Sequence, residues 1–121
     1  MTLTVALPWP PAILSPNARV HWSKRARAVK GYRGTCWALA HMAKLRVTWP
    51  GDIHVWLDYF PPNRARRDQD NLIAASKAAL DGLADALKVD DVRFRLHPYL
   101  HHDQVRAGGS LVVRLSRGPT A

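Results

Sequence analysis

The sequence predicts a single α+β domain: a small mixed β-sheet of about four strands with two main helices, in the order strand, helix, strand, helix, strand, strand. Three observations lead to this prediction. Segments of alternating apolar residues are interspersed with segments of helical periodicity. No internal repeat is present. A chain of 121 residues suffices for one hydrophobic core but not for two, so we expect one domain over residues 1–121.

The first half of the chain predicts a strand, a loop and a helix. Residues 2–7 carry apolar side chains at every second position, as in a half-buried strand. Prolines at positions 8, 10 and 11 end this strand, and we expect an ordered loop over residues 9–22. Ser23 is the expected N-cap of a helix that runs to about Leu45.

The second half predicts three further strands and the second helix. Residues 53–60 are apolar on both faces of an extended segment, which favours a central strand. The strongest helical pattern follows over residues 70–88, with a stripe of leucines and alanines. Strands over 92–97 and 111–115 complete the sheet, with a turn at Gly108 and Gly109 before the last one.

The charge of the chain predicts a polyanionic partner. Eighteen Lys and Arg against nine Asp and Glu give a net charge of +9 and a pI near 10.6, which attracts nucleic acid over a Debye length. The alternative is that the cations only keep a small protein in solution. Two basic stretches stand out, and they contain Arg19, Lys24, Arg25, Arg27, Lys30 and Arg33 in one, and Arg64, Arg66 and Arg67 in the other.

Composition also argues against several classes of protein. No apolar run approaches the ~20 residues of a membrane helix, and the N-terminus has no charged leader. We therefore expect neither a membrane-spanning nor a secreted protein. The single cysteine, Cys36, cannot form an intramolecular disulfide, which fits a reducing cytoplasm.

The acidic residues of this basic chain lie at the ends of predicted elements. Asp68 and Asp70 precede the second helix, and Asp90 and Asp91 follow it. A straight helix of that length separates the two pairs by ~27 Å. They can meet only if the chain after Asp91 runs back beside the start of the helix, or if a dimer shares the site.

One face of the predicted helix has the chemistry of phosphodiester cleavage. At 100° per residue Asp70, Lys77 and Asp81 share a stripe, with Ala74 between them. Carboxylates are hard oxygen ligands for Mg²⁺, and a lysine adds a positive charge at the phosphate. The structural alternatives are that Asp68 or Asp70 caps the helix, that Lys77 and Asp81 form a surface pair, and that Asp90 and Asp91 belong to a turn.

Four segments of the chain resemble the RusA family of Holliday junction resolvases. The sequence Arg-Arg-Asp-Gln-Asp-Asn-Leu at 66–72 is followed by Lys-Ala-Ala-Leu-Asp-Gly-Leu at 77–83 and Val-Asp-Asp-Val at 89–92. The opening Leu-Pro-Trp-Pro-Pro at 7–11, with Asn17, is similar to the N-terminal strand and loop of the family. Together these segments span most of the chain.

The resemblance implies a magnesium-dependent endonuclease, with Mn²⁺ as a possible substitute, that acts in DNA recombination and repair. It implies a cytoplasmic homodimer, encoded by a bacterium or a phage, that makes paired nicks in opposing strands of a four-way DNA junction. Matched to this sequence, the metal-binding and catalytic aspartates are Asp68, Asp70 and Asp91. Asn71 and Asp90 support these ligands without binding the metal.

Lys77 is the best candidate for the catalytic lysine. In the common family pattern the lysine follows the second aspartate by one helical turn, where this chain has Ala74; Lys77 lies two turns on. In the expected mechanism the three aspartates hold Mg²⁺ and Lys77 or Arg67 offsets charge on the phosphate. The other expected DNA contacts are Arg19, Lys24, Arg25, Arg27, Lys30, Arg64 and Arg66.

Three further interpretations stay open at the level of sequence. A basic module could bind branched or single-stranded DNA without cutting it, and a nuclease could lack structural preference. His97, His101 and His102 with Asp103 could hold zinc, although exposed strand positions or phosphate contacts fit them better. The five tryptophans favour core or dimer-interface positions over stacking on unpaired bases, with Trp9 and Trp22 undecided.

Overall fold

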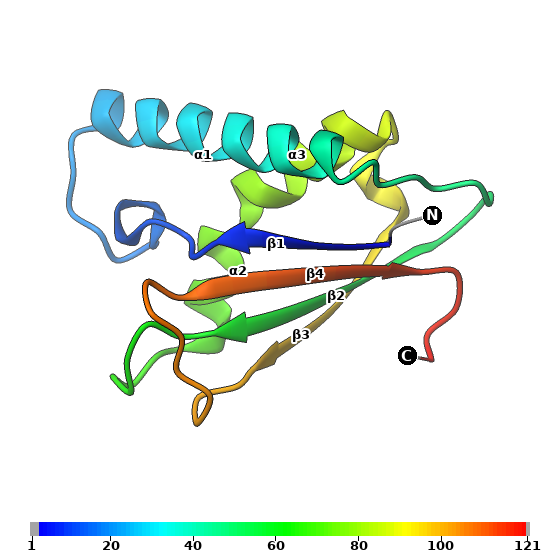
Figure 1. Ribbon diagram of the computed structural model, residues 1–121. Helices are drawn as coiled ribbons and strands as arrows, with labels where there is room; N and C mark the ends of the chain where they lie inside the picture. Colours follow the sequence, from blue (N-terminus) through cyan, green and yellow to red (C-terminus); the bar gives the residue numbers. More distant parts are fainter. Residues whose placement is uncertain (1–2, 121) are drawn as a thin grey trace.

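The computed structural model describes residues 3–120 and contains a four-stranded mixed sheet with three α-helices (Figure 1). The sheet has the strand order β1-β4-β2-β3; β2 pairs parallel with β3 and antiparallel with β4, and β4 pairs antiparallel with β1. The elements in chain order are β1 (Thr4–Pro8), α1 (Trp22–Met42), β2 (Ile53–Phe60), α2 (Gln69–Ala75), α3 (Lys77–Leu87), β3 (Phe94–Leu100) and β4 (Ser110–Ser116). The predicted α+β class and the four strands are confirmed.

The core lies between one face of the sheet and the helices. On β2 the buried side chains are Ile53, Val55, Leu57 and Tyr59, and β4 adds Leu111, Val113 and Leu115 to the same face. The central position predicted for β2 is confirmed, because β2 lies between β4 and β3. Within residues 3–120 no helix covers the opposite face, where His54, Trp56 and Asp58 of β2 are half-buried and Phe60 is buried (Figure 1).

Helix α1 has a different N-cap residue from the one predicted. His21, and not Ser23, is the N-cap, because its Nδ1 accepts a hydrogen bond from Ser23 N at 3.2 Å. The helix ends at Met42 instead of Leu45, since Lys44 takes a left-handed conformation at φ 58°. Within the expected loop before α1, residues Ala12–Leu14 form a 3₁₀ turn. Thr2, the first residue of the expected strand, lies outside the described residues.

The single helix predicted over residues 70–88 is two helices, α2 and α3, that meet at Ser76. Ser76 is 0% exposed. Its Oγ donates a hydrogen bond to Leu72 O at 2.8 Å and shares another with the Tyr59 hydroxyl at 2.8 Å. A serine that bonds back to the carbonyl four residues earlier bends a helix. The periodicity was correct, but the bend depends on a partner from β2 that the helix pattern does not contain.

The chain after α3 turns back before it enters β3. Lys88 ends α3 in a left-handed conformation at φ 57°. Asp90 Oδ1 then accepts from Val92 N at 2.9 Å and caps a 3₁₀ turn over Asp91–Arg93. For this reason the third strand begins at Phe94 and not at Val92. None of the helices in residues 3–120 has the length and apolarity needed to cross a membrane.

Helices α1 and α3 approach closely at Gly82. A Cβ built on Gly82 would lie 2.5 Å from Arg33 O and 3.0 Å from Trp37 N, both in the backbone of α1. Gly34, by contrast, lies within α1 with nothing within 4 Å of its Cβ position. Only Gly82 is therefore required for helix packing.

We expect Gly82→Ala to lower the free energy of unfolding by about 1–3 kcal/mol, because the helices must move apart to admit the methyl group. Gly34→Ala is the matched control and should raise it by about 0.5–1 kcal/mol, since alanine favours an open helical position. Urea denaturation followed by circular dichroism measures both. Equal effects of the two substitutions would contradict the close helix contact.

Candidate functional site

The first two predicted aspartates lie at the start of α2. Asp68 is its N-cap: Asp68 Oδ1 accepts hydrogen bonds from Asp70 N at 2.8 Å and from Asn71 N at 3.4 Å. The capping interpretation of Asp68 is therefore confirmed. Both carboxylates are exposed, and Oδ2 of Asp68 forms no hydrogen bond with another described residue, so capping leaves an oxygen of this carboxylate available.

Lys77, the first residue of α3, joins two carboxylates from different parts of the chain. Its Nζ donates to Asp81 Oδ1 at 2.7 Å and to Asp91 Oδ2 at 3.0 Å. The pair with Asp81 is the expected neighbour four residues on. Asp91 reaches Lys77 because the chain after Lys88 turns back beside α3.

The contacts of Lys77 shift its own pKa and that of Asp91. Hydrogen bonds to Asp81 and then to Asp91 raise the pKa of Lys77, so the ammonium persists to higher pH than an isolated lysine. The hydrogen bond from Lys77 lowers the pKa of Asp91. The Lys77 side chain is 62% exposed, and an ammonium so placed can reach a phosphate that approaches from solvent.

The stripe predicted along the second helix is continued by α1. Ala74, Lys77 and Asp81 line a small hollow of about 100 Å³ together with Arg25 of α1. Asp70 lies one turn before Ala74 on α2, so it shares that side of the helix. Sequence reasoning placed these residues on one stripe but did not assign Asp81 to the site, although its spacing of four from Lys77 was the available signal.

The described side chains do not form a ready three-ligand metal cage. Residues 3–120 contain no group of three or more His, Cys, Asp and Glu side chains placed to hold a metal ion. That Asp68, Asp70 and Asp91 share one ion stays a prediction. The donor chemistry fits Mg²⁺, which keeps several waters and is commonly held by one or two carboxylates; Asp81 and Asp91 already share one cation, the Lys77 ammonium.

The histidines considered for zinc have separate partners. His97 Nε2 lies 2.8 Å from His54 Nδ1, His101 Nε2 lies 2.7 Å from Asp58 Oδ1, and His102 Nε2 lies 3.5 Å from Asp103 Oδ2. The three side chains predicted from the sequence as an alternative zinc set are thus engaged at three different places.

Arg67 connects the aspartate segment to the proline-rich N-terminal loop. Its guanidinium donates to Asn63 O at 2.9 Å and lies 5.3 Å from the centre of the Trp9 ring. Trp9, Arg67, Asp68 and Asn71 line a hollow of about 220 Å³. Two of the four segments that carry the family resemblance, almost sixty residues apart, therefore form one surface. Trp9 itself packs edge-on against buried Tyr59, at 6.0 Å between ring centres.

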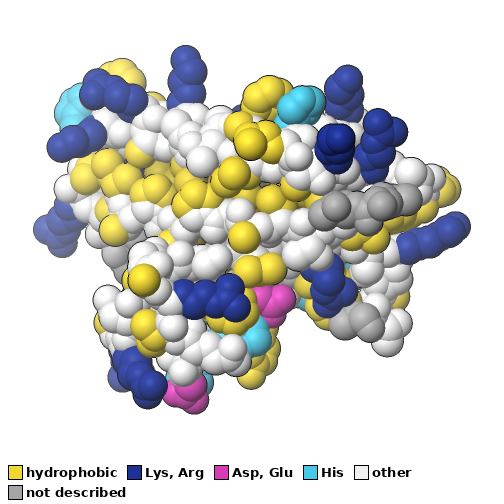
Figure 2. Space-filling view, viewed as in Figure 1, with side chains coloured by type: hydrophobic (Ala, Val, Ile, Leu, Met, Phe, Trp, Pro, Cys, Tyr) yellow, Lys and Arg dark blue, Asp and Glu magenta, His cyan; other side chains and the backbone are white. Residues whose placement is uncertain are grey.

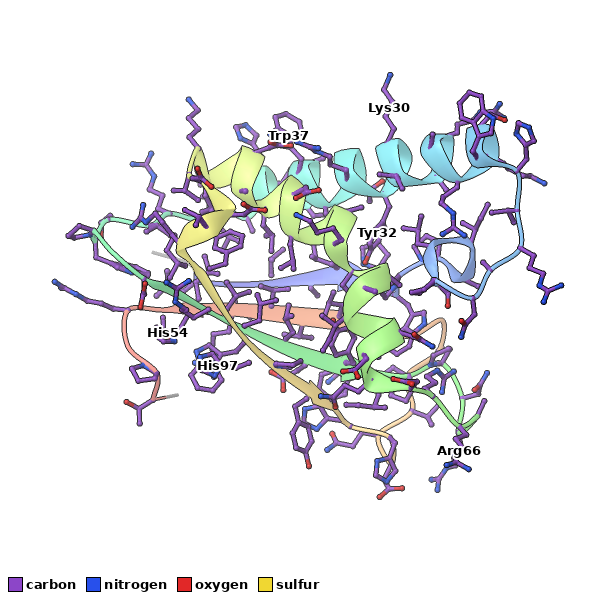
Figure 3. All side chains as sticks on the ribbon, turned by 180° about the vertical axis from the view of Figure 1, so that it is seen from behind. Lys30, Tyr32, Trp37, His54, Arg66 and His97 are labelled. Atoms are coloured by element: carbon purple, nitrogen blue, oxygen red, sulfur yellow. The ribbon has the colours of Figure 1, made fainter. Side chains whose placement is uncertain are left out.

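The other predicted DNA contacts divide into structural and exposed cations. Arg25 donates to Ser15 O at 3.2 Å and to Ala18 O at 2.7 Å, so it fixes the loop before α1. The exposed cations are Arg19, Lys24, Arg27, Lys30, Arg64 and Arg66. Figure 2 shows Lys and Arg side chains along the outer side of α1, and in Figure 3 Lys30 and Arg66 lie on opposite sides of α2 and α3.

Two tryptophans of α1 lie on the surface: Trp22, which the sequence left undecided, and Trp37, for which it favoured the core or a dimer interface. Trp22 is 74% exposed at the start of α1, and Trp37 is exposed and stacks on His41 at 5.2 Å. Both lie on α1, which also carries three of these six exposed cations. The helical pattern could not separate them from core positions, because α1 has apolar residues on several sides.

Comparison with known proteins gives one informative similarity. The chain is 42% identical over 116 residues to an uncharacterized protein of Xylella fastidiosa (strain Temecula1 / ATCC 700964), and the match covers 93% of this chain and 75% of that protein. No family model matches the chain.

We expect Lys77→Met to raise the pKa of the Asp91 carboxyl towards its ordinary value. In the wild type the pKa of Asp91 is lowered, so its pair with Lys77 stabilises the fold at pH values above the ordinary carboxyl pKa. This stabilisation is lost as the pH falls through the lowered pKa of Asp91. Carbon-13 NMR of the aspartate carboxyls measures the titration. Asp85, whose pKa is lowered by its hydrogen bond to Arg33, is the control and should be unchanged. An Asp91 titration unaffected by the substitution would contradict the Lys77 contact.

Proposed function

This chain belongs to the same protein family as the Xylella fastidiosa protein, and we propose that it is a magnesium-dependent endodeoxyribonuclease that resolves four-way DNA junctions by paired nicks. The reaction is a phosphodiester hydrolysis in DNA recombination and repair. We place it in the cytoplasm of a bacterium, encoded by the bacterium itself or by a phage.

The observation that carries the proposal is the position of Lys77. An exposed ammonium at the start of α3 is held between Asp81 and Asp91, from two different segments, within two helical turns of Asp70. A cation fixed by carboxylates beside further exposed carboxylates is suited to a reaction whose transition state is an anionic phosphorane. A helix cap alone would need neither Lys77 nor Asp91.

Asp68, Asp70 and Asp91 are the carboxylates that we propose to hold Mg²⁺, which Mn²⁺ could replace. When bound, the metal would supply a hydroxide nucleophile and a positive charge at the phosphate. Asn71 and Asp90 would orient these ligands: Asn71 N and Val92 N bind the carboxylates of Asp68 and Asp90 and fix their direction.

The positive side chains would position the DNA. Lys77 or Arg67 would offset charge on the phosphate that is cut. The exposed cations of the two basic stretches would hold the phosphodiester backbone, which gives binding that depends steeply on salt and little on sequence. A homodimer would present two such sites to two opposing strands.

The second candidate function is a non-catalytic DNA-binding module. The capping role of Asp68 favours it, since a helix cap is expected in a purely structural arrangement. The two candidates differ in their need for magnesium: a nuclease requires it to cut, and a binding module does not respond to it.

We expect the protein to nick a synthetic four-way junction in Mg²⁺ and not in EDTA, and we expect Asp70→Asn to bind the junction normally while cutting at least about a hundredfold more slowly. Substitution of residues that only support metal ligands already lowers metal affinity or activity by about 10–100-fold. Gel electrophoresis of end-labelled junction arms measures nicking, and mobility shift measures binding.

The matched control is Asp52→Asn, since Asp52 is an exposed aspartate before β2, at the opposite end of that strand from α2. It should cut like the wild type. Normal cutting by Asp70→Asn would refute the assignment of the site, and magnesium-independent binding without any nicking by the wild type would favour the binding module. Equal cutting of a linear duplex would show a nuclease without structural preference.

A further inference from the structure

The open face of the sheet carries a set of aromatic and basic side chains that the proposed cleavage site does not use. The register places these residues on one face, because residues paired across neighbouring strands, and every second residue along a strand, point to the same side of a sheet. They are His54, Trp56, Asp58 and Phe60 of β2, Arg95, His97 and Tyr99 of β3, and Arg114 of β4.

The centre of this face is a layered stack. The His97 ring lies parallel to the Trp56 ring, with 4.0 Å between centres and 14° between planes. The guanidinium of Arg114 lies 4.9 Å from the Trp56 ring centre. His54 lies beside His97, as the two labelled rings in Figure 3 show, with 2.8 Å between the nearest nitrogens. These contacts hold flat rings and a cation rigidly on the surface.

A second group lies further along the same strands. Tyr99 is 62% exposed, and its ring centre lies 4.6 Å from that of His101. His101 stacks on Phe60 at 4.6 Å with 4° between planes, and the guanidinium of Arg106 lies 3.5 Å from the Phe60 ring centre. The two groups are therefore built alike, each with stacked rings and an arginine over an aromatic face.

Between the two groups the surface forms a shallow hollow. It has a volume of about 510 Å³ and is lined by Trp56, Asp58, His97, Tyr99 and Arg114, with two further residues of β3. Tyr99 leaves most of its ring in solvent at the side of this hollow. A large exposed ring next to a rigid stack is able to receive another flat ring.

The charge of the open face indicates whether a ligand with such a ring is anionic or cationic. Within the described part of the chain, neither Arg106 nor Arg114 forms an ion pair with an acidic side chain. The acid of the face, Asp58, is engaged by His101 at 2.7 Å. Basic and histidine side chains gather over β4, β2 and β3 in the lower half of Figure 2, among isolated acidic ones. The face is thus suited to an anionic ligand.

A second copy of this chain fits the face less well. In a symmetric pair each unengaged arginine would meet the same positive surface of its partner, since a twofold interface repeats one patch on both sides. Exposed aromatic rings beside cations are the features that bind single-stranded nucleic acid, where bases stack on the rings and phosphates lie near the cations.

We propose that the open face of the sheet binds single-stranded nucleic acid, with a base stacked on Tyr99 and phosphates held by Arg114 and Arg106. The face lies on the other side of the sheet from α2 and α3. The proposal is therefore independent of the proposed cleavage activity, and each can fail without the other.

The test uses a fluorescein-labelled oligothymidylate of about ten nucleotides, within the range that single-strand sites cover, and an abasic strand of the same length. Fluorescence anisotropy measures the Kd of the full-length protein for both strands in EDTA, where cleavage is absent. We expect Tyr99→Leu to weaken binding of the oligothymidylate at least about fivefold, the loss expected for one stacked base, and to leave the abasic strand unaffected. Arg114→Gln should weaken the binding of both strands. It should also lower by about one the slope of the logarithm of the binding constant against the logarithm of the salt concentration.

The matched control is Trp22→Leu, which removes an exposed aromatic ring from α1 and should leave both affinities unchanged. Thermal unfolding verifies that each variant is folded. Unchanged oligothymidylate binding by folded Tyr99→Leu would overturn the proposal. So would sedimentation equilibrium that shows a dimer dissociated by Tyr99→Leu, since the face would then bind a second copy of the chain.

Discussion

The buried hydrogen bond between Tyr59 and Ser76 is the constraint on which the arrangement of the candidate site depends. It ties β2 to the junction of α2 and α3 in the middle of the core, where an unpaired hydroxyl would cost about 1–3 kcal/mol. Both hydroxyls are satisfied, and no buried side-chain polar atom within residues 3–120 lacks a partner. The bend at Ser76 sets the direction in which α3 leaves α2, and so the position of Lys77.

The bend and the return of the chain after Lys88 act together. A straight helix would hold the two aspartate pairs at its opposite ends. In the structure the chain runs back beside α3, so Asp91 meets Lys77 near the start of that helix instead of standing beyond its end. The close contact of α1 with α3 at Gly82 supports this arrangement from the other side. Packing among α1, α3 and the sheet therefore brings Asp91 to Lys77 and Asp81.

The two faces of the sheet differ in what they can bind. The covered face supports α2 and α3, which carry exposed carboxylates and Lys77 between two groups of cations. The open face bears stacked aromatic rings and arginines without acidic partners, a composition suited to bases as well as phosphates. We propose that both surfaces bind nucleic acid, the covered side through carboxylates and cations and the open face through aromatic rings and arginines.

The sequence by itself determined the fold class, the four strands, the existence of the helices and the pairing of Lys77 with Asp81, because alternation, helical periodicity and spacing of four residues are local properties of the chain. The positions of the aspartates at the ends of elements could be predicted from the sequence for the same reason. Only the tertiary structure decided the bend at Ser76, the meeting of Asp91 with Lys77, the contact of Trp9 with Arg67 and the aromatic stack on the open face. Each of these joins residues from separate elements, and such contacts depend on how the sheet and helices pack, which no local pattern encodes.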